Sequence, residues 1–354
     1  LSKEFAEATA TVLANKGIKV ILSDKISSTP MVSLLTTKLK AAGGIVITAS
    51  HNPARYNGFK IKGDFGGPAH PEMIEKVEKE LRKVLKSKVQ SKKTFEELVE
   101  KGTIKKIDFT AVYVEDIKTK IDIPLIVSSG LKIAYDAMYG AGQGVFSQLV
   151  PPRAELRSSF NPSFGGTHPE PIQQNIKDLS SAVVMKGCDI GIATDGDADR
   201  IGALDENGNF VDSHRIFAIL LKYLVLDKHH TGEIAKSISV SQIINKMCKK
   251  YGLKLHETPV GFKYLCRLMT GRNILIAAEE SGGLGLRAHL PERDGIYVGL
   301  LLCEVMATRK RKLSELVEEL MIEFGAHCYN RIDAHMTERE KKQTLAAYKK
   351  GIKS

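Results

Sequence analysis

Three aspartates stand at alternating positions in one short segment, Asp195-Gly196-Asp197-Ala198-Asp199-Arg200. Carboxylate oxygens at this spacing can converge on one hard divalent cation, and crowded carboxylates repel one another without a counter-ion. The segment also fits the start of an EF-hand loop, with Glu206 at its twelfth position. However, Arg200 stands where that loop needs glycine, and the flanks are typical of strands. The pattern therefore predicts a divalent-metal site, with Arg200 beside it as a fixed cation for an anionic ligand.

A hydroxyl-bearing turn follows an apolar run near the amino end, Thr48-Ala49-Ser50-His51-Asn52-Pro53. Small residues, an Asx residue and a proline favour a tight turn that exposes Ser50 at a strand end, where ligand sites of α/β sheets gather. Serine is a weak nucleophile unless a base or a metal activates it. His51 adjoins Ser50, and Lys60 follows a little later. Two interpretations stay open, an ordinary serine/threonine turn and a reactive hydroxyl.

A third polar segment, Glu279-Glu280-Ser281-Gly282-Gly283, ends another apolar run. Carboxylate and hydroxyl groups on a glycine-rich loop suit recognition of a polyol, although a charged loop with glycine hinges has the same composition. His289 and Arg293 lie shortly after it. Gly261 and Lys263 begin a predicted helix, whose first-turn amides and ammonium group could hold a phosphate.

A glycine-rich segment at 140–144 follows a predicted strand and has the spacing GxGxG. A dinucleotide-binding fingerprint requires GxGxxG, so a tight strand-to-helix turn explains this segment better.

Short apolar runs alternate with helix-length amphipathic segments, which is the pattern of α/β proteins. Strands are predicted at 18–22, 44–48, 59–62, 131–136, 189–193, 200–204, 253–258 and 273–278. Helices are predicted at 30–40, 71–85, 112–119, 143–149, 213–226, 241–251, 261–269, 295–307 and 313–324, with a further one ending at 182. The polar, lysine-rich stretch 86–105 is predicted to be a linker. Three units of similar size indicate a repeated architecture, although no sequence repeat is visible.

Composition excludes several classes of protein. The 354 residues carry a net charge of +11, are 43% hydrophobic and contain 26% charged residues, so disorder is excluded as the main state. No uncharged apolar stretch is long enough to cross a membrane. The lysines are interleaved with acids and aromatics are few, so we expect no nucleic-acid or membrane partner, and the positive field suits a small anionic substrate. Five widely spaced cysteines form no CxxC pair, which favours reduced thiols and a cytoplasmic location.

Taken together, five segments resemble the α-D-phosphohexomutase superfamily, the phosphoglucomutase/phosphomannomutase enzymes. They are ITASHNPARYNGFKIKG (47–63), FNPSFGGTHPEP (160–171), ATDGDADRIG (193–202), ETPVGFKYL (257–265) and AAEESGG with PERDG (277–295), in the family's order. The resemblance implies an α/β fold of three consecutive related domains, with mixed sheets sandwiched by helices around a central cleft, followed by a fourth domain. We accordingly expect domains at 1–105, 106–230 and 231–330. The fourth, phosphate-binding domain and the family's opening segment have no counterpart here, so 331–354 is expected to be a linker toward that domain and the sequence to be part of a longer chain.

The resemblance also implies roles for individual residues. Ser50 matches the phosphoserine, whose phosphate is a metal ligand together with Asp195, Asp197 and Asp199, normally around Mg²⁺. Lys60 matches a lysine placed for proton transfer, with His51 and Arg200 beside it. Glu279 and Ser281 match residues that hold sugar hydroxyls, and Lys263 matches a residue lining the same cleft. Gly261, Arg293 and His289 are further candidates for substrate binding. His289 is also a candidate base, because Gly283 stands where several members carry a histidine.

The expected reaction is phosphate transfer between the 1- and 6-positions of a hexose phosphate, with glucose 1,6-bisphosphate as the intermediate. Glucose 1-phosphate is the preferred substrate and mannose phosphate the other candidate, in a monomer or dimer. Two alternatives are a non-catalytic sugar-phosphate-binding protein on the same scaffold and a phosphatase that hydrolyses its phosphoserine.

Overall fold

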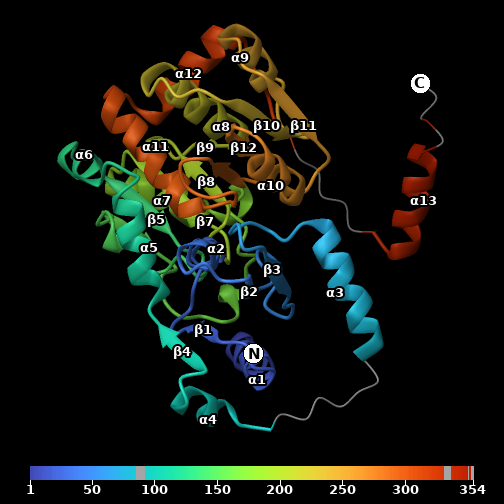
Figure 1. Ribbon diagram of the computed structural model, residues 1–354. Coiled ribbons are helices and arrows are strands. Elements are labelled where there is room, and N and C mark those ends of the chain that lie inside the picture. The colour runs from blue at the N-terminus through green and yellow to red at the C-terminus, as the bar shows by residue number, and fades with distance from the viewer. Residues whose placement is uncertain (85–91, 331–335, 350, 352–354) are drawn as a thin grey trace.

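A computed structural model describes residues 1–84, 92–330, 336–349 and 351. Helices and sheets pack together along the chain, as Figure 1 shows, and the two larger sheets are mixed, so the predicted α/β class is confirmed. Among the described residues, no helix is both long enough and apolar enough to cross a bilayer. All five cysteines are free thiols, with Cys328 exposed and the others buried.

The amino-terminal region contains two small sheets. Strand β1 (Val20–Ser23) pairs in parallel with β4 (Ile104–Ile107), and β2 (Gly44–Ile47) pairs antiparallel with β3 (Phe59–Lys62). Its helices are α1 (Ser2–Asn15), α2 (Thr29–Lys38), α3 (Pro71–Val84) and α4 (Phe95–Glu100). Helix α2 begins where the Ser28 hydroxyl accepts a bond from the Met31 amide, with a proline in the first turn.

The predicted linker at 86–105 is wrong over its described part. Helix α4 starts with a capping box between Thr94 and Glu97, and β4 adds to β1 through backbone bonds. Residues 85–91 lie outside the described part of the chain. The stretch was misread because the two central residues of β4, Lys105 and Lys106, are both exposed, so the strand shows no alternation of apolar and polar residues.

The middle region is a five-stranded sheet of order β6-β5-β7-β8-β9. Its strands are β5 (Ile133–Asp136), β6 (Ala154–Leu156), β7 (Ile190–Thr194), β8 (Ile201–Leu204) and β9 (Phe210–Val211). Its helices are α5 (Phe109–Lys118), α6 (Ile123–Ser128) and α7 (Lys177–Lys186), with 3₁₀ turns at Phe146–Gln148, Phe164–Gly166 and Gln173–Asn175. The helix predicted at 143–149 is therefore wrong, since only one 3₁₀ turn forms there.

The third region has a four-stranded sheet of order β11-β10-β12-β13. Its strands are β10 (Glu233–Ser237), β11 (Leu255–Thr258), β12 (Ile274–Ala278) and β13 (Leu284–Leu286). Its helices are α8 (Ser213–Lys222), continued by a π-helix at Tyr223–Asp227, then α9 (Ile243–Tyr251), α10 (Phe262–Gly271), α11 (Gly295–Arg309) and α12 (Leu313–Phe324). Within the predicted linker 331–354, a helix α13 (Glu338–Lys349) forms with no buried residue.

The middle and third regions repeat one arrangement. In each, the second strand lies outside the first, the third pairs in parallel with the first, and the fourth returns antiparallel. The β7–β8 and β12–β13 hairpins are therefore equivalent, and the antiparallel pair β2–β3 has the same form. These three hairpins carry the aspartates, the Glu279 loop and Ser50 respectively. Each of the three polar segments thus lies in the turn between two antiparallel strands.

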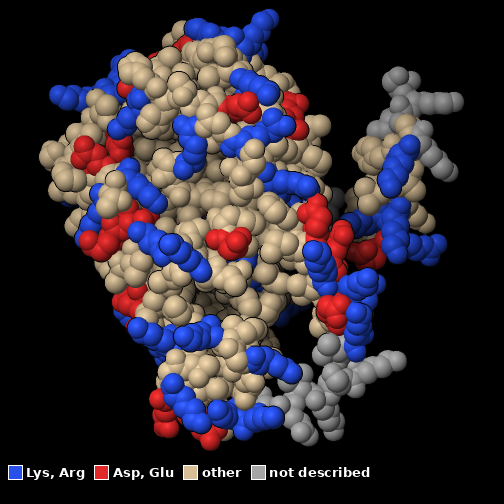
Figure 2. Space-filling model, viewed as in Figure 1, with Lys and Arg blue, Asp and Glu red and all other residues tan. Residues whose placement is uncertain are grey.

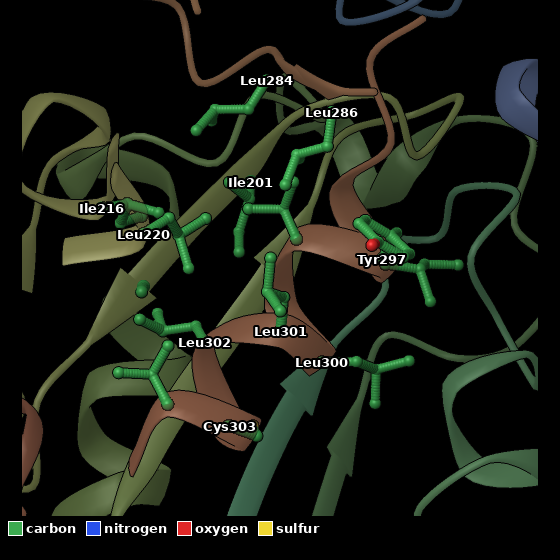
Figure 3. Packing of buried hydrophobic residues seen from close by; sticks show 14 of the residues in the cluster. Ile201, Ile216, Leu220, Leu284, Leu286, Tyr297, Leu300, Leu301, Leu302 and Cys303 are labelled. Atoms are coloured by element: carbon green, nitrogen blue, oxygen red, sulfur yellow. The ribbon is translucent and has the colours of Figure 1, made fainter. Parts of the chain in front are cut away.

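Helix α11 joins the middle and third regions. It is buried from Gly295 to Ala307, which requires an apolar helix on every face. Its side chains lie in one cluster with those of β8, β13 and α8, as the residues around Leu301 and Leu302 in Figure 3 show. The main hydrophobic core runs from Met31 of α2 through the middle sheet to Phe324 of α12. The regions are therefore packed on one another.

The basic charge is dispersed on the visible face of the molecule. Figure 2 shows lysines and arginines scattered over this face with acidic residues among them. This distribution is typical of solvated helix faces rather than of one continuous basic stripe.

Candidate active site

Ser50 and the aspartate turn meet in space. The Ser50 hydroxyl donates a 3.0 Å hydrogen bond to Asp195 Oδ2, although 145 positions separate the two residues. Ser50 is half-buried, and its amide donates to the Thr48 hydroxyl in the serine/threonine turn expected from the sequence. The hydroxyl thus lies at the edge of the acidic cluster.

The three aspartates form one buried cluster. One carboxylate oxygen from each of Asp195, Asp197 and Asp199 lies within 4.8 Å of the others. The turn holds its own shape, because Asp195 Oδ1 accepts the amides of Asp199 (2.9 Å) and Arg200 (3.1 Å). Asp197 Oδ1 and Asp199 Oδ1 are buried without a hydrogen-bond partner. Two bare carboxylate oxygens in a buried acidic cluster are suited to a hard cation.

The charge balance of the cluster supports the same conclusion. Burial and the neighbouring carboxylates raise the pKa of Asp195 well above its usual value. Burial also raises the pKa of Asp199, against the opposing effect of Arg293. The pKa of Asp197 is lowered instead, because Lys60, the Thr29 hydrogen bond and Arg293 together outweigh the cost of burial. The charged forms of Asp195 and Asp199 are therefore disfavoured by burial and by the crowding of the carboxylates, and a divalent ion between them would offset that cost. The residues present fit such an ion.

Three cationic side chains surround the aspartates. Lys60 Nζ lies 2.8 Å from Asp197 Oδ2 and 3.8 Å from Asp199 Oδ2. Burial disfavours the ammonium form of Lys60, but Asp199 and Asp197 outweigh it and its pKa is raised. Arg293 donates to Asp199 Oδ2 at 2.5 Å, and Arg200 Nε lies 3.8 Å from Asp199 Oδ1. Lys60 thus holds its proton at the edge of the cluster.

The two turns approach closely. Ser50 and Ala198 adopt left-handed φ angles of 54° and 57°, which are uncommon for residues with side chains and concentrate at functional sites. A Cβ atom on Gly196 would lie 2.3 Å from the Ser50 carbonyl oxygen. Glycine is therefore required where the turn of one region packs on that of another.

The Glu279 loop lies next to this cluster. Glu279 Oε2 is 3.5 Å from Arg293 Nη1, and its Oε1 accepts the Gly261 amide at 3.0 Å. Ser281 is half-buried on the same turn. Lys263 is exposed, and its ammonium lies over the Tyr264 ring. Glu279 thus accepts the amide of Gly261, the residue before α10, which the sequence had suggested as part of a phosphate site.

The two candidate histidines lie in different environments. Burial and the nearby Arg200 lower the pKa of His51 to about 4, so its imidazole is neutral at pH 7. His289 is a correction, because the structure places it in a buried network and not against the aspartates. Its ring bonds to Asp294 and Lys120 and stacks on Tyr297. With both nitrogens bonded and its side chain 1% exposed, His289 does not serve as the base suggested for it.

Sequence reasoning missed two contributors to the site. The Thr29 hydroxyl donates to Asp197 Oδ2 at 2.6 Å, and the Thr29 amide donates to the Asp197 carbonyl oxygen. Glu292 binds Lys62 and Ser33 below the cluster. A helix-start signal at Ser28-Thr29-Pro30 could have located the first, but no local pattern pairs Lys62 with Glu292.

The glycine-rich segment at 140–144 packs against the backbone of the aspartate turn. A Cβ on Gly140 would lie 2.8 Å from the Asp195 and Gly196 carbonyl oxygens, and one on Gly142 would lie 2.3 Å from the Tyr135 hydroxyl. Close backbone packing explains these glycines.

Family models identify all three regions. The models described as phosphoglucomutase/phosphomannomutase α/β/α domains I, II and III match residues 1–88, 111–208 and 212–324 respectively.

Curated relatives carry several related names. The chain is 31% identical to a phosphoglucomutase/phosphomannomutase of Thermococcus kodakarensis, over 83% of this chain and 64% of the relative. It is 32% identical to a phosphoglucosamine mutase of Carboxydothermus hydrogenoformans, over 88% of this chain and 70% of the relative. It is 30% identical to human phosphoglucomutase-1, over 96% of this chain and 66% of that protein. The chain thus spans about two thirds of these relatives' lengths.

Solved structures show the same fold. The crystal structure of a phosphomannomutase candidate from Thermus thermophilus superposes with a TM-score of 0.83 at 32% identity, covering 91% of this chain and 72% of that one. An N-acetylphosphoglucosamine mutase from Aspergillus fumigatus, solved with GlcNAc-6P and magnesium, superposes at 0.57 and 17% identity, covering 88% and 83%.

Proposed function

The chain belongs to the phosphoglucomutase/phosphomannomutase family, and from that premise we propose that Ser50 carries a phosphoryl group which it exchanges with a hexose phosphate. The observation that carries the proposal is the 3.0 Å contact between the Ser50 hydroxyl and Asp195 Oδ2. A phosphate on that oxygen would lie beside the aspartates and the cations around them.

The proposed transfer runs between Ser50 and a sugar hydroxyl. The phosphorus–Oγ bond of phosphoserine breaks, a bond from phosphorus to the sugar oxygen forms, and the proton that the sugar hydroxyl loses is balanced by the proton that Ser50 Oγ gains. The resulting bisphosphorylated sugar reorients and returns its other phosphoryl group to Ser50, which moves the phosphate between the 1- and 6-positions. Phosphoryl transfer depends on positioning and on neutralising charge. Lys60, Arg200 and Arg293 would supply fixed positive charge here, and Lys60 holds a proton that it can give to an oxygen losing its phosphorus.

The cation site would be formed by Asp195, Asp197 and Asp199 with the phosphate on Ser50. A bound divalent ion such as Mg²⁺ supplies charge that stabilises the phosphoryl oxygens during transfer. Thr29 and Lys60 both bind Asp197 Oδ2, so they fix this carboxylate in one orientation.

We propose a glucose phosphate as the preferred substrate, with mannose phosphate as the other candidate and glucose 1,6-bisphosphate as the intermediate. The Glu279 loop supports the sugar class, because its carboxylate and Ser281 can bind neighbouring hydroxyls. Relatives named for glucose, mannose and glucosamine phosphates all match at similar identity, so the choice among them rests on the loop sequence. Glucose 1-phosphate, mannose 1-phosphate and glucosamine 1-phosphate assayed side by side would test it.

The decisive experiment measures phosphate on Ser50 together with isomerisation. Intact mass should show one phosphate on the wild-type protein after incubation with glucose 1,6-bisphosphate, and none on Ser50→Ala. A coupled assay should then show glucose 6-phosphate formed from glucose 1-phosphate by the wild type alone. Near-normal turnover by Ser50→Ala would reject the role of Ser50.

The same assay separates the alternatives. Free phosphate released in place of isomerised sugar would identify a phosphatase. Sugar phosphate bound without phosphorylation or turnover, in the full-length protein, would identify a binding protein on this scaffold.

The remaining sequence expectations stay proposals. We propose domain limits at 1–105, 106–230 and 231–330, a cytoplasmic location and a monomer or dimer. Limited proteolysis would test the limits, and light scattering would test the oligomeric state.

A further inference from the structure

Arg293 connects the aspartate cluster to the Glu279 loop. Its Nη2 donates to Asp199 Oδ2 at 2.5 Å, and its Nη1 lies 3.5 Å from Glu279 Oε2. The guanidinium also lies over the Phe262 ring, and the side chain is only 11% exposed. One cation thus spans a proposed metal ligand and a proposed sugar ligand, so its position affects both.

The residues on either side of Arg293 are anchored in two other regions. On one side, the Glu292 carboxylate pairs with Lys62 of β3 and accepts the Ser33 hydroxyl of α2. On the other side, both carboxylate oxygens of Asp294 accept the Tyr113 hydroxyl of α5 at 2.8 Å. Arg293 is therefore held on a short segment whose two ends are tied to the amino-terminal and middle regions.

The Lys62–Glu292 pair is almost completely buried, at 1% and 0% exposure. Removing both charges from water costs about as much as their attraction returns, so such a pair is weak evidence for stability. The best-attested use of a buried polar pair is to select one register. Here the pair fixes the position of β3 relative to the segment that carries Arg293.

Two lysines of β3 form ion pairs with residues of the other regions. Lys60 and Lys62 point to one face of the strand, because side chains alternate along a strand. Lys60 reaches Asp197, while Lys62 reaches Glu292. The Arg293 amide in turn donates to Glu292 Oε1 at 3.0 Å. The Lys62–Glu292 pair thus affects the position of Lys60 relative to Asp197 and the position of Arg293.

Gly283 packs directly against the aliphatic part of the Arg293 side chain. A Cβ atom on Gly283 would lie 2.2 Å from Arg293 Cδ, so the guanidinium stem packs on bare backbone. Arg293 is therefore enclosed by Glu292, Gly283 and Phe262.

We propose that Lys62 and Glu292 are positioning residues that hold Arg293 between Asp199 and Glu279. The bonds of these two side chains run to each other, to Ser33 and to the Arg293 amide, so both act through Arg293 and through the position of β3. The effect on turnover rests on the proposed function, whereas the holding of Arg293 is a property of the fold and is measurable without substrate.

The primary test follows the Arg293 Nε–H by NMR in the [¹⁵N]arginine-labelled chain. This nitrogen is buried without a hydrogen-bond partner, 3.7 Å from Glu292 Oε1, so it reports on that carboxylate. Its signal is assigned by its loss in Arg293→Gln. In Lys62→Met the signal should shift and its hydrogen should exchange at least about tenfold faster with water. Lys62→Arg should restore it, and an unchanged signal in Lys62→Met would overturn the proposal.

Two further variants separate a specific effect on the position of Arg293 from a general loss of stability. Lys62→Met/Glu292→Met replaces the pair with apolar groups and should fold as well as the wild type, yet lose the protected Arg293 signal. Lys222→Met removes another buried lysine, which pairs with Glu319 and Glu323 far along α12. It should lower the melting temperature and leave the Arg293 signal unchanged. Retained protection in the double variant, or loss of it in Lys222→Met, would overturn the proposal.

A calorimetric measurement with Mg²⁺ alone extends the test. Freeing Asp199 from Arg293 should tighten Mg²⁺ binding in Lys62→Met by about fivefold or more. In an Arg293→Gln background, the same change should have no further effect, because Lys62 acts through Arg293. A persistent effect in that background would overturn the proposal. If the wild type binds no Mg²⁺ and transfers no phosphate, the proposed function fails, while the NMR result still decides the positioning role.

Discussion

The Ser50 turn and the aspartate turn occupy equivalent hairpins but are built differently. The aspartate turn joins β7 and β8, whose residues are all buried, and its three carboxylates are at most 2% exposed. The Ser50 turn joins β2 and β3, in each of which a single residue is buried. The cation site is therefore shaped by a rigid core, whereas the serine depends on contacts with its neighbour for its position.

This difference suits a reaction in which the aspartate turn holds concentrated negative charge and the Ser50 turn carries the transferred phosphoryl group. The rigid side keeps crowded carboxylates together against their repulsion. The less buried side leaves the hydroxyl accessible to a sugar.

The largest effect is expected from Asp197→Asn, which changes the residue that ties the two sides together. Asp197 Oδ2 accepts bonds from Thr29 and Lys60, so the amide loses a proposed metal ligand and two anchors. Mg²⁺ affinity measured by calorimetry should fall about 10²-fold or more. Asp205→Asn is the matched control, since Asp205 is also buried but caps its own turn through the Asn207 and Asn209 amides. Undiminished Mg²⁺ binding by Asp197→Asn would remove Asp197 from the metal ligands.

The unequal burial of the two hairpins should appear in stability. Ile192 of β7 is fully buried against α11, and its change to alanine should cost about 2–5 kcal/mol. Val46 is the single buried residue of β2, and its change to alanine should cost about 1.5 kcal/mol. Urea denaturation measures both. Equal losses would contradict the idea that one side is rigid and the other adjustable.

The contact between the turns is tested by Gly196→Ala. The added Cβ would lie 2.3 Å from the Ser50 carbonyl oxygen, so the turns must separate by part of an ångström or more. Phosphoryl transfer should fall about 10²-fold, since misplacement on the order of 1 Å has that cost. Gly271→Ala is the control, because no atom lies within 4 Å of its added Cβ. Full activity in Gly196→Ala would show that the two turns need not touch.

The smallest effect is expected from His214, near the Glu280 carboxylate in the third region. Burial lowers the pKa of His214 below its usual 6.5, against the opposing effects of Asp212 and Glu280. The unfolded chain then binds the proton first, so stability is fully present above pH 6.5 and falls as the pH drops below it. Urea midpoints between pH 5 and 7.5 should show this slope in the wild type and a flatter one in His214→Gln. An identical slope in both would assign the pH dependence to other groups.

Local patterns were sufficient where one element carries its own signal. Strand β3 lies at the predicted residues 59–62, and helices such as α12 at Leu313–Phe324 agree with their apolar spacing. The predictions failed where burial contradicts composition. Strand β10 was missed because it contains Lys236, which is fully buried and bonds to Glu257 and the Val240 carbonyl oxygen. Its neutralisation depends on partners that no local window contains.

The sequence by itself determined which residues could do chemistry and which turns would expose them, since turn geometry and ligand type are properties of a few adjacent residues. Only the tertiary structure decided that Ser50 touches Asp195, that Lys62 pairs with Glu292, and that His289 lies in a different network. Such pairs form because packed sheets bring distant hairpins together, and the energy of that packing is spread over the whole core.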